Sequence, residues 1–420
     1  MITQTLFAQR LKKARGDRAF SQQKVADALG IPRTAVVLIE KGERSVSTIE
    51  LAKIADLFQM PISTFFEISQ DRPTLDENAI FAKLRGTLPV ESLEVEKEVH
   101  RHLSLCRLGV ELETRIGLFR RLELPCYERP EPGNKIEAAI QGEEVADEER
   151  RRLNLGDAPL LNLVGLITNQ GVWVAGVDFP DFISGMILRT EEIGTVILID
   201  SSQGVERKRF SLAHEYAHAL LDRDEAQRFT TKENRPLLSE ARANGFAAAF
   251  LMPESGIRHF LRQRGKGAQI REQSVIIDET GEGAIEADLR RPSGSQTITY
   301  RDVAHLALYF GVSYPSAVYR LDALGFINKQ ERQDLLDAES MRKDYQRLLK
   351  LFDEDQEKKS AEAEELVTQV AYLAIEAYRR GKLSEGRLGE IAKTLRLSKS
   401  SFLLVAREAL DVSAELALTE

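Results

Sequence analysis

His214-Glu215-Tyr216-Ala217-His218 is the stretch that decides the fold and the chemistry of this chain. On an α-helix, residues four apart lie on one face, about 5–6 Å apart. Both imidazoles can therefore bind one Zn²⁺ at about 2.0–2.1 Å. Glu215, one step around the helix, can take a proton from the water activated there. The alternative is a buried helix whose two histidines bind no metal.

The residues beside this motif favour a buried helix. Positions 213, 217, 220 and 221 form one apolar stripe, and positions 212, 216 and 219 add a second. A helix that is apolar on most of its surface is buried. Buried polar groups without partners are costly. The two histidines and the glutamate therefore need a partner, and a metal ion would supply it.

A second helix is predicted over residues 239–253, with Ser239 as its N-cap and Pro253 near its end. Glu240 and Asn244 share a face that is otherwise small and apolar, so this face can pack closely on the motif helix. We expect Glu240 to be the third metal ligand. Asn244 would hydrogen-bond one of the ligating imidazoles. The alternative for Glu240 is that it only complements the helix dipole.

These motifs together resemble the ImmA/IrrE metallopeptidases of bacteria and phages, over about residues 155–330. The resemblance is carried by Arg209 to His218, by Glu240-x-x-Ala243-Asn244-x-Phe246-Ala247 and by Leu251-Met252-Pro253. Tyr216-Ala217 replaces the more usual Leu-Gly inside the motif. The resemblance implies a gluzincin-like α+β zinc peptidase with a glutamate as third ligand. It also implies a protein substrate that is a transcriptional regulator of the XRE class.

Near the N-terminus, residues 21–42 predict two short helices joined by a turn at Gly30. A helix-turn-helix needs a small residue, a turn and core contacts at fixed positions. These positions hold Ala26, Gly30, Ile31, Val36 and Ile39. The pattern resembles the XRE family, whose Ile-Glu-Lys-Gly-like ending is present at 39–42.

The XRE resemblance implies binding to a double-stranded DNA operator, with the second helix in the major groove. Arg33 and Thr34 would contact base edges, while Gln22 and Arg44 would contact phosphates. Residues 1–70 hold ten Lys/Arg against seven Asp/Glu, whereas the whole chain carries a net charge of −8. A basic module on an acidic chain indicates local nucleic-acid binding. The alternative is a helical module that binds a protein.

The composition is that of a soluble protein, with 43% hydrophobic and 30% charged residues. No apolar run approaches 18 residues, so we expect no membrane span. The opening Met1-Ile2-Thr3-Gln4-Thr5 has no signal-peptide pattern. Cys106 and Cys126 fit free thiols of a reducing cytosol. We therefore expect a cytoplasmic protein without a membrane partner. Its oligomeric state is left open, with a homodimer as one option.

The expected fold class is mostly α with a small β-sheet, that is, α+β. Residues 171–177 and 195–200 are the predicted strands of the sheet. Residues 303–324 and 391–398 also look like helix-turn-helix units. We expect a structural role for the first, and the second lacks the turn glycine. The expected domains are a helix-turn-helix domain at 1–68, a helical connector at 69–154 with a linker from Gln70, the peptidase at 155–330, and a helical C-terminal region at 331–420 with a charged stretch at 352–365.

The function predicted from these features is transcriptional regulation combined with zinc-dependent endopeptidase activity. The enzyme would cleave a regulatory protein, bound extended along a sheet edge, in a stress or mobile-element response. The alternative is a DNA-binding repressor or sensor whose zinc site is structural or senses a ligand. Glu215 favours the enzyme, because a structural site needs no general base.

Overall fold

The chain divides into two compact units, Met1–Arg72 and Pro73–Glu420, which are treated separately. The expected linker from Gln70 and most of the charged stretch at 352–365 lie outside the described residues. The computed structural model describes residues 8, 11–12, 14–16, 20–58, 77–87, 93–118, 124–222, 227–231, 237–266, 271–277, 284–290, 296–338, 345 and 365–417.

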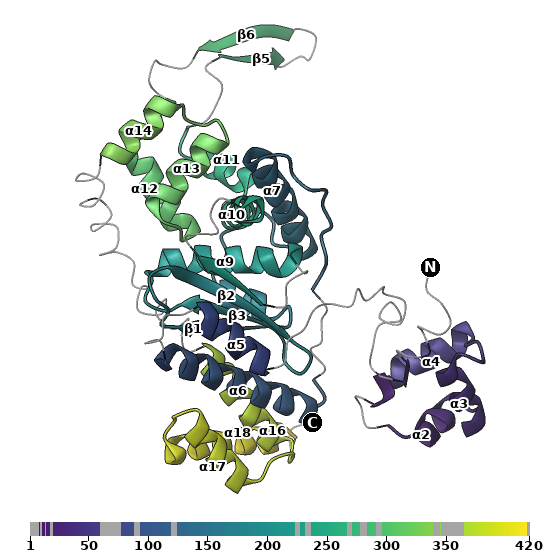
Figure 1. The fold of residues 1–420 in the computed structure, drawn as a ribbon. Coiled ribbons are helices and arrows are strands. Elements are labelled where there is room, and N and C mark those ends of the chain that lie inside the picture. The colour runs from purple at the N-terminus through teal and green to yellow at the C-terminus, as the bar shows by residue number, and fades with distance from the viewer. Residues whose placement is uncertain are drawn as a thin grey trace. The chain divides into compact units, whose positions relative to one another are not determined.

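The N-terminal unit contains the helices α2 (Gln22–Leu29), α3 (Arg33–Lys41) and α4 (Thr48–Phe58) (Figure 1). The Ser21 hydroxyl caps α2 by accepting a hydrogen bond from the Lys24 amide at 3.1 Å. Gly30 adopts a φ of 73°, which ends α2 and turns the chain into α3. The core of the unit is apolar and includes Val25, Ala26, Leu29, Val36, Ile39 and Ile54.

The second unit is built on a four-stranded sheet of order β1-β3-β2-β4. Its strands are β1 (Val172–Val177), β2 (Ile183–Thr190), β3 (Gly194–Asp200) and β4 (Gln227–Thr231). β1 runs parallel to β3, and the other two pairs are antiparallel. The sequence predicts β1 and β3, and the structure adds β2 and β4. β4 lies at one edge of this sheet.

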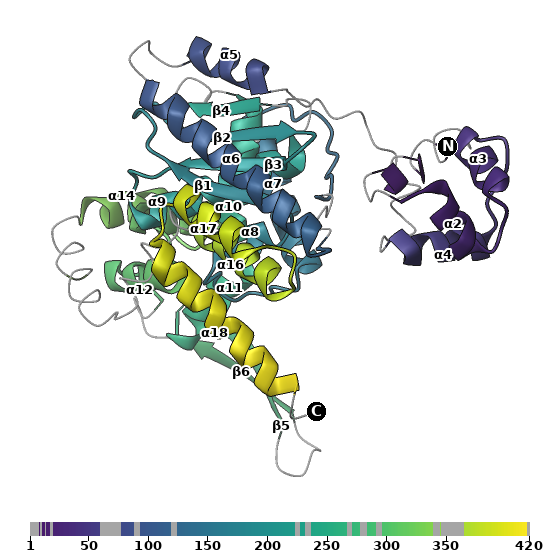
Figure 2. The same ribbon diagram turned by 90° about the horizontal axis from the view of Figure 1, so that it is seen from below.

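Helices cover both faces of the sheet, so that the strands are buried on two sides (Figures 1 and 2). On β1, Val172 and Val174 pack toward one helical layer, while Trp173 and Ala175 pack toward the other. The first layer consists of α7 (Lys135–Arg152), α8 (Leu163–Thr168), α9 (Val205–Leu221), α10 (Leu238–Leu251), α11 (Glu254–Gln263), α12 (Tyr300–Phe310), α13 (Tyr314–Ala323) and α14 (Lys329–Asp337).

The opposite layer brings together helices from distant parts of the sequence. It consists of α5 (Glu77–Thr87), α6 (Leu93–Arg115), α16 (Glu365–Arg379), α17 (Glu385–Thr394) and α18 (Lys399–Ala417). Helices expected to form a connector and a C-terminal region are thus packed on the same sheet as the motif helix. A separate antiparallel pair, β5 (Arg271–Ile277) and β6 (Ala284–Arg290), completes the elements.

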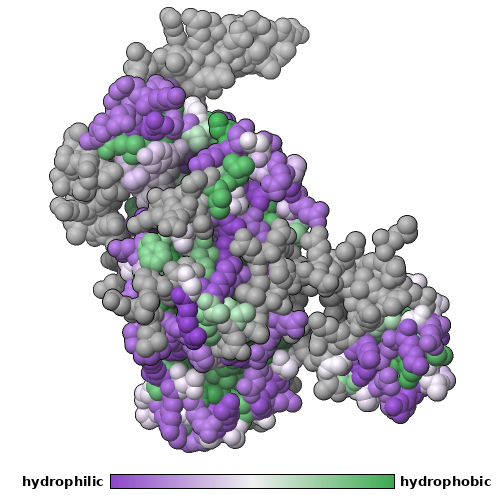
Figure 3. All heavy atoms as spheres, viewed as in Figure 1, coloured by the Kyte–Doolittle hydropathy of each residue, from purple (hydrophilic) through white to green (hydrophobic). Residues whose placement is uncertain are grey.

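The expected fold class, mostly helical with a small sheet, is confirmed. On the face shown in Figure 3, hydrophilic residues predominate over the described surface, and apolar residues form small groups. None of the helices in the described parts of the chain combines the length and apolarity needed to cross a membrane.

Two glycines bring the backbones of α7 and α10 into direct contact. A Cβ at Gly142 would lie 2.0 Å from the carbonyl oxygen of Arg242, and one at Gly245 would lie 2.3 Å from the carbonyl oxygen of Ala139. Any larger residue would push the helices apart, because main-chain atoms cannot move aside as a side chain can. This contact fixes the position of α10, the helix that carries Glu240.

We predict that Gly142→Ala lowers the free energy of unfolding by about 1–3 kcal/mol, because the added methyl group overpacks the helix contact. Gly86→Ala is the matched control, since Gly86 lies in α5 with open space around it. That change should be neutral or stabilising by up to about 1 kcal/mol. Urea unfolding of both variants measures the difference. Equal stability of the two variants would contradict the close contact.

Candidate functional site

The motif lies on α9, whose residues from Ser211 to Leu220 are buried between the sheet and α10. His214 and His218 lie one turn apart on the same face. Their ring centroids are 4.7 Å apart, and the rings are inclined by 78°. The buried helix predicted from the apolar stripes is therefore present, with both imidazoles on one side of it.

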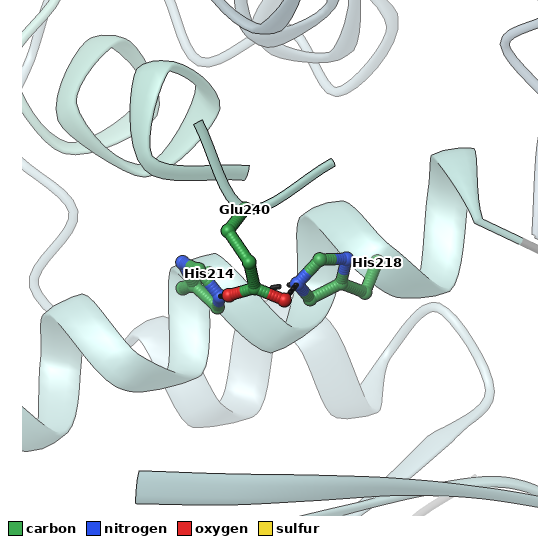
Figure 4. A group of neighbouring side chains, drawn as sticks. All are labelled: His214, His218 and Glu240. Atoms are coloured by element: carbon green, nitrogen blue, oxygen red, sulfur yellow. Dashed lines mark hydrogen bonds and ion pairs between the residues drawn. The ribbon is translucent and has the colours of Figure 1, made fainter. Parts of the chain in front are cut away.

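Glu240, in the first turn of α10, meets the two imidazoles (Figure 4). His214 Nε2 lies 3.1 Å from His218 Nε2 and 3.1 Å from Glu240 Oε2. His218 Nε2 lies 3.4 Å from Glu240 Oε1. The three side chains are buried, and they form a group that could hold a metal ion. The structure thus brings together the three residues that the sequence suggested as ligands.

Each imidazole is oriented by a polar group on its far side. His214 Nδ1 lies 3.0 Å from Asn244 Oδ1, as the sequence suggested. His218 Nδ1 lies 2.5 Å from Asp222 Oδ2, and the other oxygen of Asp222 pairs with Arg242 at 2.5 Å. Because an amide oxygen and a carboxylate accept hydrogen bonds, each Nδ1 is the donor on the outer side, and each Nε2 faces the centre of the triad.

Asp222 was missed by the sequence reasoning, although its position held a signal. It follows His218 by four residues, so the two side chains lie on one face at the end of α9. Burial lowers the pKa of His218, whereas the hydrogen bonds that its imidazole donates to Asp222 and Glu240 raise it. The hydrogen bonds prevail and raise the pKa of His218 to about 9.

Arg228, on β4, is a second residue that the sequence did not indicate. Its guanidinium pairs with Glu240 Oε1 at 2.8 Å and donates to the Ser239 hydroxyl at 2.7 Å. Burial would raise the pKa of Glu240, but hydrogen bonds from His214 and His218 outweigh it and hold that pKa well below its usual range. Glu240 therefore stays ionised, as a ligand must.

Glu215 points from α9 toward β2. Its side chain is fully buried. Neither carboxylate oxygen has a partner at ordinary hydrogen-bond geometry within the described parts of the chain, and the Thr230 hydroxyl of β4 is near enough to stabilise the carboxylate weakly. Gly185 on β2 makes the room, since a Cβ there would lie 2.4 Å from Glu215 Oε1. Burial raises the pKa of Glu215, and the positive charges of His214 and His218 oppose this. An unpaired buried carboxylate beside the triad is costly for stability and suited to accept a proton.

Tyr216 faces the opposite side of α9 and serves packing. Its hydroxyl donates to the buried carboxylate of Glu149 on α7 at 2.5 Å. Glu149 also accepts from Tyr127 at 2.7 Å and pairs with Arg152 at 2.7 Å. Burial raises the pKa of the Tyr216 hydroxyl well above its usual value. The unusual tyrosine in the motif thus anchors α9 to α7.

In the N-terminal unit, Arg33 and Thr34 are exposed at the start of α3, where a recognition helix offers side chains to bases. Gln22 instead donates to Glu40 at 2.9 Å, and Arg44 pairs with Glu50 at 2.7 Å. Both remain partly exposed. The DNA contacts of all four residues stay predictions.

Two family models match the chain. Residues 168–322 match the IrrE N-terminal-like domain of the M78 peptidases, and residues 11–65 match a helix-turn-helix domain. A search of curated proteins finds no match to the chain. The protein therefore joins an XRE-type helix-turn-helix DNA-binding domain to a metallopeptidase-like domain of the M78 type, with a buried His-His-Glu triad.

We predict that Asp222→Asn weakens Zn²⁺ binding by about 10–100-fold, because His218 loses the carboxylate that orients it. Competition with a chromophoric chelator measures the affinity. Asp322→Asn is the control, since Asp322 pairs with Arg332 on a different surface. Unchanged affinity in Asp222→Asn would remove this residue from the metal site.

For DNA, Arg33→Ala should relax sequence preference at one base pair by about 1–3 kcal/mol. Arg44→Ala should weaken binding to all sequences and reduce the salt slope by about 1, because a phosphate contact is lost. Fluorescence anisotropy with operator and scrambled duplexes separates the two effects. If Arg44 instead stays paired with Glu50 in the DNA complex, Arg44→Ala should leave the salt slope unchanged. That result would contradict the predicted phosphate contact.

Proposed function

We propose that the chain is a cytoplasmic, DNA-binding transcriptional regulator with zinc-dependent endopeptidase activity. The observation that carries the proposal is the buried Glu215 carboxylate, which lies beside the triad and makes no ion pair with Lys or Arg within the described structure. A site that only held the fold together would gain nothing from an unpaired buried carboxylate.

The triad fits Zn²⁺ in donor type and in spacing. Two imidazole nitrogens and a carboxylate oxygen are the donors of a gluzincin-type catalytic zinc site. A tetrahedral site with bonds of about 2.0–2.1 Å has edges of about 3.3–3.4 Å. The two Nε2 atoms are 3.1 Å apart, His214 Nε2 is 3.1 Å from Glu240 Oε2, and His218 Nε2 is 3.4 Å from the other carboxylate oxygen, Oε1. His214, His218 and Glu240 would therefore hold the ion without a large rearrangement.

When bound, Zn²⁺ would act as a Lewis acid on the attacking water and on the scissile carbonyl. Glu215 would accept the proton of that water and later deliver it to the leaving amine. Asn244 and Asp222 would keep both imidazoles in the ligating tautomer. Arg228 would hold Glu240 ionised and in place through their ion pair.

The sheet edge supports an extended peptide as substrate. β4 lies at the edge of the described sheet and carries Arg228, the partner of a candidate ligand, while Lys83 of α5 occupies the Gln227 carbonyl at the start of this strand. A peptide that pairs with such an edge would bind through its main chain. Because a DNA-binding domain lies on the same chain, we propose that the substrate is a regulatory protein, such as a transcriptional regulator, in a stress or mobile-element response.

One observation favours a second function. His214 is 5% exposed, Glu240 is 2% exposed, and His218 and Glu215 are fully buried. Burial from solvent would suit a metal ion that only holds the fold together, although the three protein ligands leave a fourth position open. The second candidate is therefore a DNA-binding repressor or sensor whose metal site is structural or senses a ligand.

Glu215→Gln separates these functions. The glutamine keeps the size of the side chain but cannot accept a proton at neutral pH. We expect about one Zn²⁺ per chain and a melting temperature at least as high as that of the wild type, with proteolysis reduced by about 10²-fold or more. Cleavage of the DNA-binding proteins encoded beside its gene is the assay, and transcript levels report regulation.

The control for this prediction is Glu191→Gln, at an exposed turn after β2, which should cleave and regulate as the wild type does. His214→Ala, His218→Ala and Glu240→Ala should each lose zinc. A folded, zinc-loaded Glu215→Gln protein that regulates normally would overturn the peptidase proposal in favour of the second candidate.

A further inference from the structure

Left-handed turns end several helices in the described structure, and in three helix pairs the second helix starts three residues after that turn. In the first, α2–α3, Ile31 donates its amide to the carbonyl of Ala26 at 3.1 Å, and Gly30 has a φ of 73°. In α12–α13, Val312 donates to Ala307 at 3.0 Å, and Gly311 has a φ of 64°. In both pairs the first helix ends at a residue with left-handed backbone conformation, and this residue follows a buried alanine by four positions.

The third pair, α17–α18, repeats this geometry without glycine. Leu397 donates its amide to Ala392 at 2.9 Å, and Arg396 has a φ of 59°. In each pair the second helix starts three residues after the left-handed residue, here at Lys399. Three residues after the start of the second helix, a side chain is buried in both pairs: Phe402 in α18 and Val36 in α3. The missing glycine in this stretch therefore does not prevent the turn.

The exposed faces of the second helices differ. On α13, Tyr314 and Arg320 are buried, and Arg320 pairs with Glu143, so this helix is held inside the second unit. On α18, Lys399 and Ser400 are exposed, as Arg33 and Thr34 are at the same positions of α3. α13 is thus structural, whereas α18 offers the start of its helix to a partner.

Basic residues are concentrated around the turns that join α16, α17 and α18. Residues 379–407 hold eight Lys/Arg against two Asp/Glu, whereas the whole of α16–α18, residues 365–417, holds eight Lys/Arg against seven Asp/Glu. Within the described structure, four of these basic residues make no ion pair with a carboxylate, and all four are exposed: Lys382, Lys393, Arg396 and Lys399. Exposed cations without a carboxylate partner, gathered near the turns, favour a polyanion as the partner.

We propose that α16–α18 form a second DNA-binding module, in which α18 enters a groove of duplex DNA. Lys399 and the small, exposed Ser400 and Ser401 would approach the base edges. Lys393 and Arg396, on α17 and in the turn, would contact phosphates. This region lies beyond both family matches, and the proposal is independent of proteolysis.

The test uses the full chain with Arg33→Glu and Thr34→Glu, which disable the predicted DNA surface of α3. The probe is a fluorescein-labelled, random-sequence DNA duplex of about three helical turns, titrated between about 50 and 200 mM NaCl. The patch variant adds Lys393→Gln, Arg396→Gly and Lys399→Gln. Glycine suits the left-handed turn, so the second of these changes removes charge without strain.

We expect the parent to bind the duplex, and the patch variant to bind about tenfold more weakly, with a salt slope lower by about 2–3. The control variant, Lys135→Gln, Arg262→Gln and Lys329→Gln, removes the same charge from exposed positions elsewhere and should bind like the parent. Melting temperatures check that all variants fold.

Three results would overturn the proposal. The first is that the parent shows no salt-dependent binding to the duplex. The second is that the patch and control variants bind the duplex equally well. The third is that the patch substitutions weaken binding only to vesicles of phosphatidylserine and phosphatidylcholine. The last result would assign the basic surface to a membrane. A loss of self-association through the exposed Leu404 and Val405, without any effect on DNA binding, would assign α18 to contact with a second copy.

Discussion

The convergence of His214, His218 and Glu240 in a buried space is the constraint on which the second unit depends. Three polar groups at hydrogen-bonding distance inside an apolar core are stable only when each is satisfied. Asn244 and Asp222 satisfy the outer side of each imidazole. The two Nε2 atoms and the Glu240 carboxylate contact one another, and a shared cation could bind between them. Folding and ion binding are therefore expected to be coupled.

The geometry of that centre is set by backbone contacts as much as by the ligands themselves. Gly185 lets α9 lie on β2 with the Glu215 carboxylate between them, and Gly142 lets α10 lie on α7. The ligands come from α9 and α10. A methyl group added at either glycine would therefore shift one of these helices and change the distances among the ligand atoms. A hydrogen bond between Tyr216 and Glu149 holds α9 to α7.

The sequence predicted those features of the site that depend on the spacing of residues along one helix. His214 and His218 are one helical turn apart in any helix, and Glu240 begins a second apolar helix, so their types and positions indicated a common site. Arg228 could not be predicted, because it reaches Glu240 only through the pairing of β4 with β2. Likewise, the absence of glycine at Arg396 argued against a turn that the structure nevertheless forms, since packing around the turn offsets the conformational cost.

The fold class was predictable because long, periodic segments dominate the chain. The exact layers were not, since α6 and α16 are separated by about 250 residues and meet on one face of the sheet. This separation has a consequence for synthesis on the ribosome. The N-terminal unit has its own core and can fold as soon as it emerges. The sheet face that contains Trp173 is covered in part by α5 and α6, but this layer stays incomplete until residues 365–379 have been made. A nascent or truncated chain could thus bind DNA while presenting an unfinished hydrophobic surface to chaperones and proteases.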